Sequence, residues 1–108
     1  MMYLPEIYKT FSKKFPEVIK GYEQLGKICR SAGPLEKKHQ DLIKLGIAVG
    51  ANSRGAVMSH TRKALAEGAT PEEITHVVLL SLTTTGFPNM MATMGWVGDV
   101  LEKHLQEK

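Results

Sequence analysis

Glycine and proline residues divide this chain into short segments, and that division restricts its fold more than any other feature. The sequence has 108 residues, of which 10 are glycine and 5 are proline. Between these breaks, apolar residues recur three and four positions apart, which is the spacing of one face of a helix. No segment shows the period of two that a half-buried strand requires. The pattern predicts an all-α protein, a compact bundle of about six helices.

The clearest helix start is Thr70-Pro71-Glu72-Glu73. The hydroxyl of Thr70 can accept a hydrogen bond from the amide of Glu73, the Glu73 carboxylate can accept one from the amide of Thr70, and Pro71 suits the first turn. Another segment, from Leu42 to Ala51, is almost wholly apolar, and its length and charged entry favour a buried helix over a strand. The predicted helices run from Pro5 to Lys14, Pro16 to Gly33, Pro34 to Ala51, Asn52 or Ser53 to Gly68, Thr70 to Gly86, and Pro88 onward.

Length and composition predict a single domain, 1–108, because 43% apolar and 23% charged residues are ordinary values for a globular protein. The net charge of +3 is dispersed, with glutamates near the lysines, so we expect no nucleic-acid partner. The absence of a long apolar run or a signal peptide predicts no membrane partner and a cytoplasmic location. The only cysteine, Cys29, excludes an intramolecular disulfide and is interpreted as a small buried core residue.

Two stretches carry a resemblance to a known family. They are Leu35-x-x-Lys38-x-x-Asp41-Leu42-Ile43-x-Leu45 and Ala66-Glu67-Gly68-Ala69-Thr70-Pro71-Glu72-Glu73-Ile74. Within one ungapped block from Leu35 to Gly86, they resemble the core-helix entry and the Gly-Ala-Thr-x-Glu-Glu-Ile signature of the carboxymuconolactone decarboxylase and alkylhydroperoxidase D family. The resemblance implies an alkylhydroperoxidase D-like helical fold and a homo-oligomer, either a trimer or a hexamer.

The redox members of that family have a Glu twelve residues before a Cys-x-x-Cys pair, and a His follows the pair. On this sequence, the corresponding positions are Asp41, Ser53, Ala56 and His60. Alanine cannot form a disulfide, and a serine hydroxyl is not a redox centre. The substitutions exclude thiol peroxidase chemistry at this site, although two of the four positions remain ionisable.

The residues that remain are suited to proton transfer. A histidine such as His60 can act as a general acid or base near neutral pH, and a carboxylate such as Asp41 can orient it. Ser53, beside the free amides of a helix N-terminus, can donate a hydrogen bond to an anionic substrate. We therefore predict a lyase or isomerase that needs neither cysteine nor cofactor and acts on a small carboxylated molecule. Its predicted catalytic residues are His60, Asp41 and Ser53.

Other interpretations stay open. The chain could be a peroxidase-related protein that has lost or replaced its thiols, or a non-catalytic oligomeric binding module. His60 could be a core histidine, Asp41 a partner of a nearby lysine, and Ser53 a plain N-cap. No metal site is expected, because the other histidines, His39, His76 and His104, lack ligand spacing. The soft apolar residues of the last helix could serve the core or a subunit interface: Phe87, Met90, Met91, Met94 and Trp96.

Overall fold

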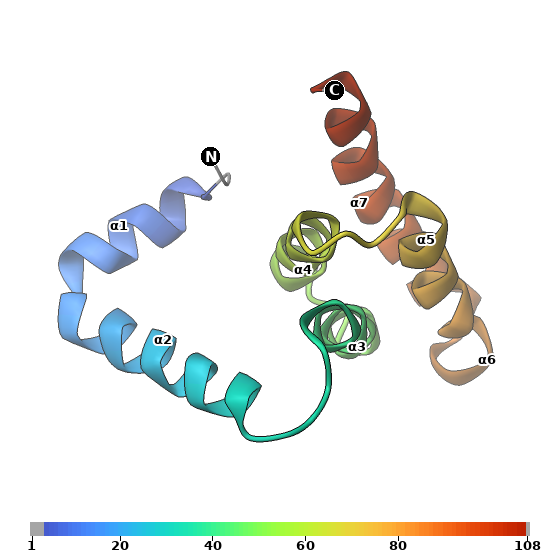
Figure 1. Cartoon of the computed structure of the whole chain (residues 1–108). Coiled ribbons are helices and arrows are strands. Elements are labelled where there is room, and N and C mark those ends of the chain that lie inside the picture. Colours follow the sequence, from blue (N-terminus) through green and yellow to red (C-terminus); the bar gives the residue numbers. More distant parts are fainter. Residues whose placement is uncertain (1–3, 108) are drawn as a thin grey trace. The chain divides into compact units, whose positions relative to one another are not determined.

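The computed structural model describes residues 4–107, which form seven helices and no strand (Figure 1). The all-α prediction is confirmed. Contacts within the chain divide it into two units, of which the first ends at Pro34 and the second begins at Leu35. The assignment of a single domain to 1–108 stays a prediction.

The first unit contains α1 (Glu6–Lys14) and α2 (Pro16–Ser31), which begin and end within two residues of the predicted bounds. Phe15 alone connects them, and its ring lies 5.3 Å from that of Phe11, between centroids. The Tyr8 hydroxyl donates a 2.9 Å hydrogen bond to Oε2 of Glu23, and this bond raises the pKa of Tyr8 above its ordinary value of 10.0. Neither helix has a buried residue.

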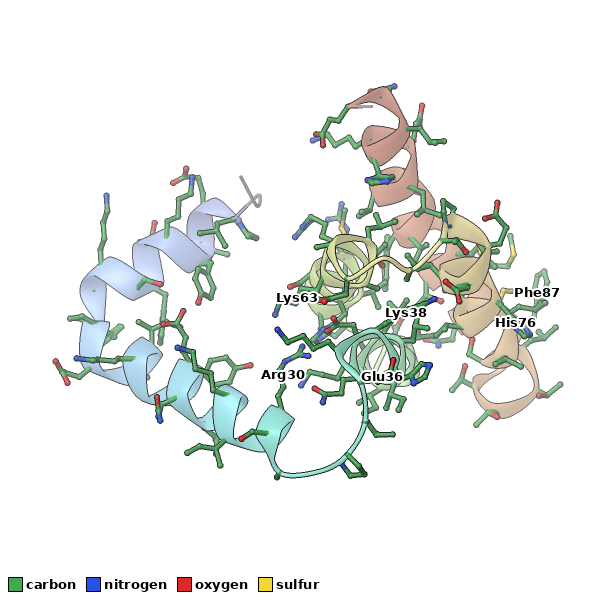
Figure 2. All side chains as sticks on the ribbon, in the orientation of Figure 1. Arg30, Glu36, Lys38, Lys63, His76 and Phe87 are labelled. Carbon is green, nitrogen blue, oxygen red and sulfur yellow. The ribbon has the colours of Figure 1, made fainter. Side chains whose placement is uncertain are left out.

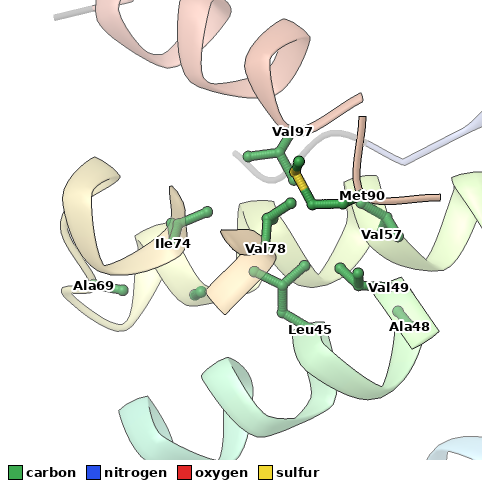
Figure 3. Packing of buried hydrophobic residues seen from close by; sticks show 10 residues of the cluster. Leu45, Ala48, Val49, Val57, Ala69, Ile74, Val78, Met90 and Val97 are labelled. Atoms are coloured by element: carbon green, nitrogen blue, oxygen red, sulfur yellow. The ribbon is translucent and has the colours of Figure 1, made fainter. Parts of the chain in front are cut away.

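The second unit contains the other five helices described, and they enclose a continuous apolar core (Figure 3). Helix α3 packs against α4, α5 and α7, and α7 packs against α4, α5 and α6. The removal of these side chains from water is the main force that holds such helices together. The helices are α3 (Lys37–Gly50), α4 (Arg54–Ala66), α5 (Pro71–Leu80), α6 (Leu82–Thr85) and α7 (Phe87–Gln106). The buried core consists of Leu45, Ala48, Val49, Val57, Ala64, Ala69, Ile74, Val78, Met90 and Val97.

Two helix boundaries differ from the prediction. Helix α3 begins three residues after Pro34, because Glu36 has extended backbone and the Gln40 side chain donates a 2.7 Å hydrogen bond to the carbonyl of Leu35. The predicted helix from Thr70 to Gly86 is interrupted at Ser81, which separates α5 from α6. There the Ser81 hydroxyl donates a 2.7 Å bond to the carbonyl of Val78 and competes with the regular helical ladder.

Helices α3 and α4 end in the same way. At the end of α3, the amide of Asn52 donates to the carbonyl of Val49 and the amide of Ser53 to that of Ala48. This pair of bonds is a Schellman motif, which requires a left-handed residue, and Asn52 has a φ of 53°. Gly68 takes the same place after α4, with a φ of 91°. The prediction that Asn52 could cap α4 is therefore wrong, since Asn52 terminates α3 and Ser53 is the N-cap.

The predicted capping box of α5 is present. The amide of Glu73 donates a 3.1 Å bond to Oγ1 of Thr70, and the amide of Thr70 donates a 2.9 Å bond to Oε1 of Glu73. Lys38, labelled in Figure 2, places its Nζ 2.9 Å from Oε2 of Glu73 and so connects the start of α3 to the start of α5. Glu73 therefore holds two helix starts together.

Replacement of Thr70 by alanine should destabilise the protein by about 1 kcal/mol, because the first turn of α5 loses its side-chain acceptor. Urea unfolding followed by circular dichroism measures this change. Thr75→Ala is the matched control, since Thr75 is exposed in the same helix and alanine is the better helix former there. Equal destabilisation by the two substitutions would contradict the role of the cap.

Glu73 should make the stability depend on pH. Its pKa lies below the ordinary value of 4.5, because the amide of Thr70 and then the Lys38 side chain donate hydrogen bonds to the carboxylate. A lowered folded-state pKa gives a contribution that is present above pH 4.5 and is lost as the pH falls through the folded-state value.

We therefore expect the difference in unfolding free energy between wild type and Glu73→Gln to shrink as the pH is lowered from neutral to about 3. Unfolding curves recorded across this range test the expectation. Glu72→Gln removes a carboxylate from the same turn and serves as the control. A wild-type advantage that stays constant over the whole range would disprove the linkage.

Candidate functional site

The candidate site lies on the hairpin formed by α3 and α4. Only three residues, Ala51 to Ser53, separate these helices, and the two helices pack against each other. So short a connection makes them antiparallel neighbours. Figure 1 views both helices along their axes, side by side. The hairpin therefore brings the start of α3 near the middle and end of α4.

Asp41 is a buried carboxyl group on the inner face of α3. Its side chain is only 2% exposed, and it occupies the same stripe as the core residues Leu45 and Ala48, four and seven positions later. Acidic side chains are almost never fully buried unless a partner compensates them, and Asp41 does take part in a polar interaction. The alternative interpretation of Asp41 as the partner of a nearby lysine stays open, although one of those lysines, Lys38, is paired with Glu73.

His60 lies on α4, beside the stripe that enters the core. The buried residues Val57, Thr61 and Ala64 form that stripe, and the Thr61 hydroxyl is satisfied by a 2.7 Å bond to the carbonyl of Val57. His60 is partly exposed, while its Nδ1 atom is buried and makes no hydrogen bond with the described residues. The residue is engaged in another polar or electrostatic interaction. One side of the imidazole therefore faces the protein interior, and the residue still reaches the surface.

The hairpin places Asp41 and His60 at similar heights. Asp41 precedes the end of α3 by nine residues, and His60 follows the start of α4 by six. At 1.5 Å per residue, their positions along the hairpin differ by only about 5 Å, or one turn. The sequence prediction that these two residues share a site is compatible with this topology.

Ser53 lies at the other end of the hairpin. It is exposed, its backbone is fixed between Ala48 and Val57, and its side chain makes no capping hydrogen bond. His60 follows it by seven residues, or about 10 Å along the axis. The structure therefore places Ser53 on the same side of α4 as His60, two turns away. The interpretation of its hydroxyl as an N-cap is wrong, although the residue occupies the N-cap position.

Asn89 is a positioning residue that the sequence did not single out. Its Nδ2 atom donates a 3.0 Å bond to the carbonyl of Val49 and a 3.1 Å bond to Oγ1 of Thr85. The first of these bonds connects residues 40 positions apart and anchors the first turn of α7 to the end of α3. Its only sequence signal is an amide side chain early in a helix, which is too common to identify a partner.

Three other residues that the sequence analysis considered are exposed to solvent. His39 and His76 are exposed, and Figure 2 shows His76 directed away from α3 and α4. Cys29 is exposed on α2, so its interpretation as a buried core residue is wrong. Within residues 4–107, no cluster of three His, Cys, Asp or Glu side chains could hold a metal ion.

The apolar residues of α7 serve two environments. Met90 is buried in the core, and Met94 and Trp96 pack against it, whereas Phe87 and Met91 are exposed. Ala56, at the position of a redox cysteine, also packs against the core. Among the helices that the structure describes, none has the length and apolar character needed to cross a membrane.

Comparison with known proteins places this hairpin in a family. The model of the carboxymuconolactone decarboxylase family matches residues 16–99, which include Asp41, Ser53, Ala56 and His60. The chain is also similar to the crystal structure of apo-lpg0406, a carboxymuconolactone decarboxylase family protein from Legionella pneumophila. The TM-score is 0.76 at 25% sequence identity, over 88% of this chain and 85% of that chain. No curated protein matches the sequence significantly. The chain belongs to the carboxymuconolactone decarboxylase family.

Proposed function

We propose that the protein is a lyase or isomerase that acts on a small carboxylated molecule by proton transfer at His60, with Asp41 as the orienting carboxylate. The burial of Asp41 carries the proposal, because a carboxyl group in the core is costly and is kept where it has a task. It lies within about one turn of the height of His60 on the facing helix. In this proposal, the Asp41 side chain orients the imidazole of His60 for proton transfer.

The chemistry requires one proton donor and no electron transfer. In a decarboxylation, the bond between the carboxylate and its carbon breaks, carbon dioxide leaves, and the electron pair passes into the conjugated carbonyl of a lactone or keto acid. The imidazolium of His60 then gives a proton to that carbon and is reprotonated from water. In an isomerisation, the same imidazole removes a proton from one carbon and returns it to another. Neither route uses the thiols that Ser53 and Ala56 replace.

The partial exposure of His60 supports its role as the group that meets the substrate. Asp41 is almost completely shielded from solvent, whereas His60 is partly exposed. A substrate arriving from solvent would therefore meet the His60 imidazole more readily than the Asp41 carboxylate. In this proposal, Ser53 contributes at the far end of a bound molecule, where its exposed hydroxyl can donate to a substrate carboxylate.

His60→Ala and Asp41→Asn should each lower turnover at least about 100-fold, because general acid-base catalysis contributes that much or more. The measurements are carbon dioxide release from carboxymuconolactone and deuterium uptake from D2O by small lactone and keto acids, followed by NMR. His39→Ala is the control, because His39 is exposed on the same helix as Asp41. Circular dichroism verifies that each variant is folded.

Equal turnover by wild type and His60→Ala would contradict the proposal. Exposed Cys29 is the specific observation that favours the peroxidase-related alternative. Consumption of a hydroperoxide with a dithiol donor, lost in Cys29→Ser, would establish that alternative instead. Binding of the same acids without any proton exchange would favour the non-catalytic module.

Ser53→Ala should raise KM several-fold and change kcat little, since the hydroxyl is expected to bind the substrate about 10 Å from His60 rather than to take part in proton transfer. Steady-state kinetics on the best substrate of the same panel separates the two constants. Ser59→Ala is the matched control, because Ser59 is a partly buried serine on the same helix. A drop in kcat as large as that of His60→Ala would place Ser53 in the catalytic machinery itself.

A further inference from the structure

Lys38 begins the inner stripe of α3. The stripe continues with Asp41, Leu45 and Ala48, at steps of three and four residues, and these three side chains are buried. Positions three apart on a helix are neighbours, with about 5–6 Å between their Cβ atoms. A lysine side chain is long and flexible, so its ammonium can reach a carboxylate one turn later. By its position in the sequence, Lys38 can therefore pair with Asp41.

In the structure, the ammonium of Lys38 pairs with a different carboxylate. Its Nζ atom lies 2.9 Å from Oε2 of Glu73, on α5. Helices α3 and α5 pack against each other, so this ion pair connects two neighbouring helices of the second unit. Two carboxyl groups thus lie within the range of Lys38, one on its own helix and one on α5. Glu73 is the one that holds it.

Glu73 is well suited to hold a cation in one place. Its Oε1 atom accepts the 2.9 Å hydrogen bond from the amide of Thr70 in the capping box, which leaves Oε2 for Lys38. The pKa of Glu73 lies below its ordinary value of 4.5, because the amide of Thr70 and then the Lys38 side chain donate hydrogen bonds to the carboxylate. The capping box thus gives Glu73 a fixed orientation, and the carboxylate is charged at neutral pH.

We propose that Glu73 is a positioning residue for Asp41. It holds the Lys38 ammonium at the start of α5, and the Asp41 carboxylate is left to orient His60. The inference rests on the function proposed above, in which Asp41 has that task. An ammonium bound to Asp41 would compensate its charge and occupy oxygen atoms that the task requires. Glu73 therefore acts on the reaction as a competitor for one cation, through Lys38 and Asp41.

Rescue of activity by a second substitution tests this competition. Glu73→Gln should lower turnover of the best substrate about 10-fold, because a released Lys38 pairs with Asp41 and weakens the acid-base catalysis. Glutamine also completes a capping box, so the start of α5 is kept. Lys38→Met in the Glu73→Gln background should restore most of the lost turnover, since no ammonium remains at this position. Lys38→Met alone should change turnover little.

A purely structural role of the ion pair predicts a different pattern. If the pair only held α3 against α5, Lys38→Met alone would lower turnover as much as Glu73→Gln, and the double variant would be no better than either. Lys44→Met in the Glu73→Gln background is the matched control, because Lys44 also lies three residues from Asp41. This variant should keep the low turnover. Failure of Lys38→Met to restore turnover, or equal restoration by Lys44→Met, would overturn the proposal.

An NMR titration provides a readout that does not require turnover. The signal of the Asp41 carboxyl carbon reports the pKa of that group, and a lysine ammonium beside a carboxyl group lowers its pKa. The midpoint of the Asp41 titration should therefore fall by about 1 pH unit in Glu73→Gln and return to the wild-type value when Lys38→Met is added. Glu72→Gln, in the same turn of α5, is the control and should change the midpoint little.

The two experiments separate the positioning role from the reaction. A shift of the Asp41 titration that Lys38→Met reverses, in a protein that turns over none of the substrates, would support the role of Glu73 and contradict the proposed reaction. Turnover by wild type that Glu73→Gln leaves unchanged, together with an unchanged Asp41 titration, would support the reaction and overturn the positioning role.

Discussion

The carbonyl of Val49 is the acceptor on which the arrangement of the second unit depends. It receives one hydrogen bond from the amide of Asn52, in the turn that terminates α3, and another from the side chain of Asn89, in the first turn of α7. One oxygen atom therefore bears on the placement of three helices, since α4 starts two residues after Asn52. An unsatisfied carbonyl at this depth would be costly, so both donors favour the same arrangement. This arrangement also sets the relative positions of Asp41 and His60 along the α3–α4 hairpin.

Local chemistry made most of the helices predictable. The capping box at Thr70, the proline at the start of α2 and the glycine after α4 act within a few residues, so the sequence alone reveals them. The features that the sequence did not reveal arise where a side chain competes with the backbone amides for a carbonyl acceptor. Gln40 delays the start of α3 and Ser81 interrupts the helix after α5, because each side chain bonds to a carbonyl that a longer helix would have used.

The candidate site residues stay predictions, and the burial of Asp41 was not foreseen from the sequence. Asp41 falls into the stripe of Leu45 and Ala48 by simple periodicity, a signal that could have identified it as buried. Three neighbouring lysines made a surface ion pair equally reasonable from the sequence. The role of Asn89 was beyond sequence reasoning, because its partner lies 40 residues away and nothing local marks it. The family's redox frame identified the four positions, and the substitutions at Ser53 and Ala56 removed its thiol chemistry.

The location of the core has a consequence for how this chain can vary. Every residue of the core cluster lies between Leu45 and Val97, and none belongs to α1 or α2. Substitutions in the first two helices therefore change no side chain of this cluster. The first unit can vary in sequence while every member of the core of the second unit stays the same.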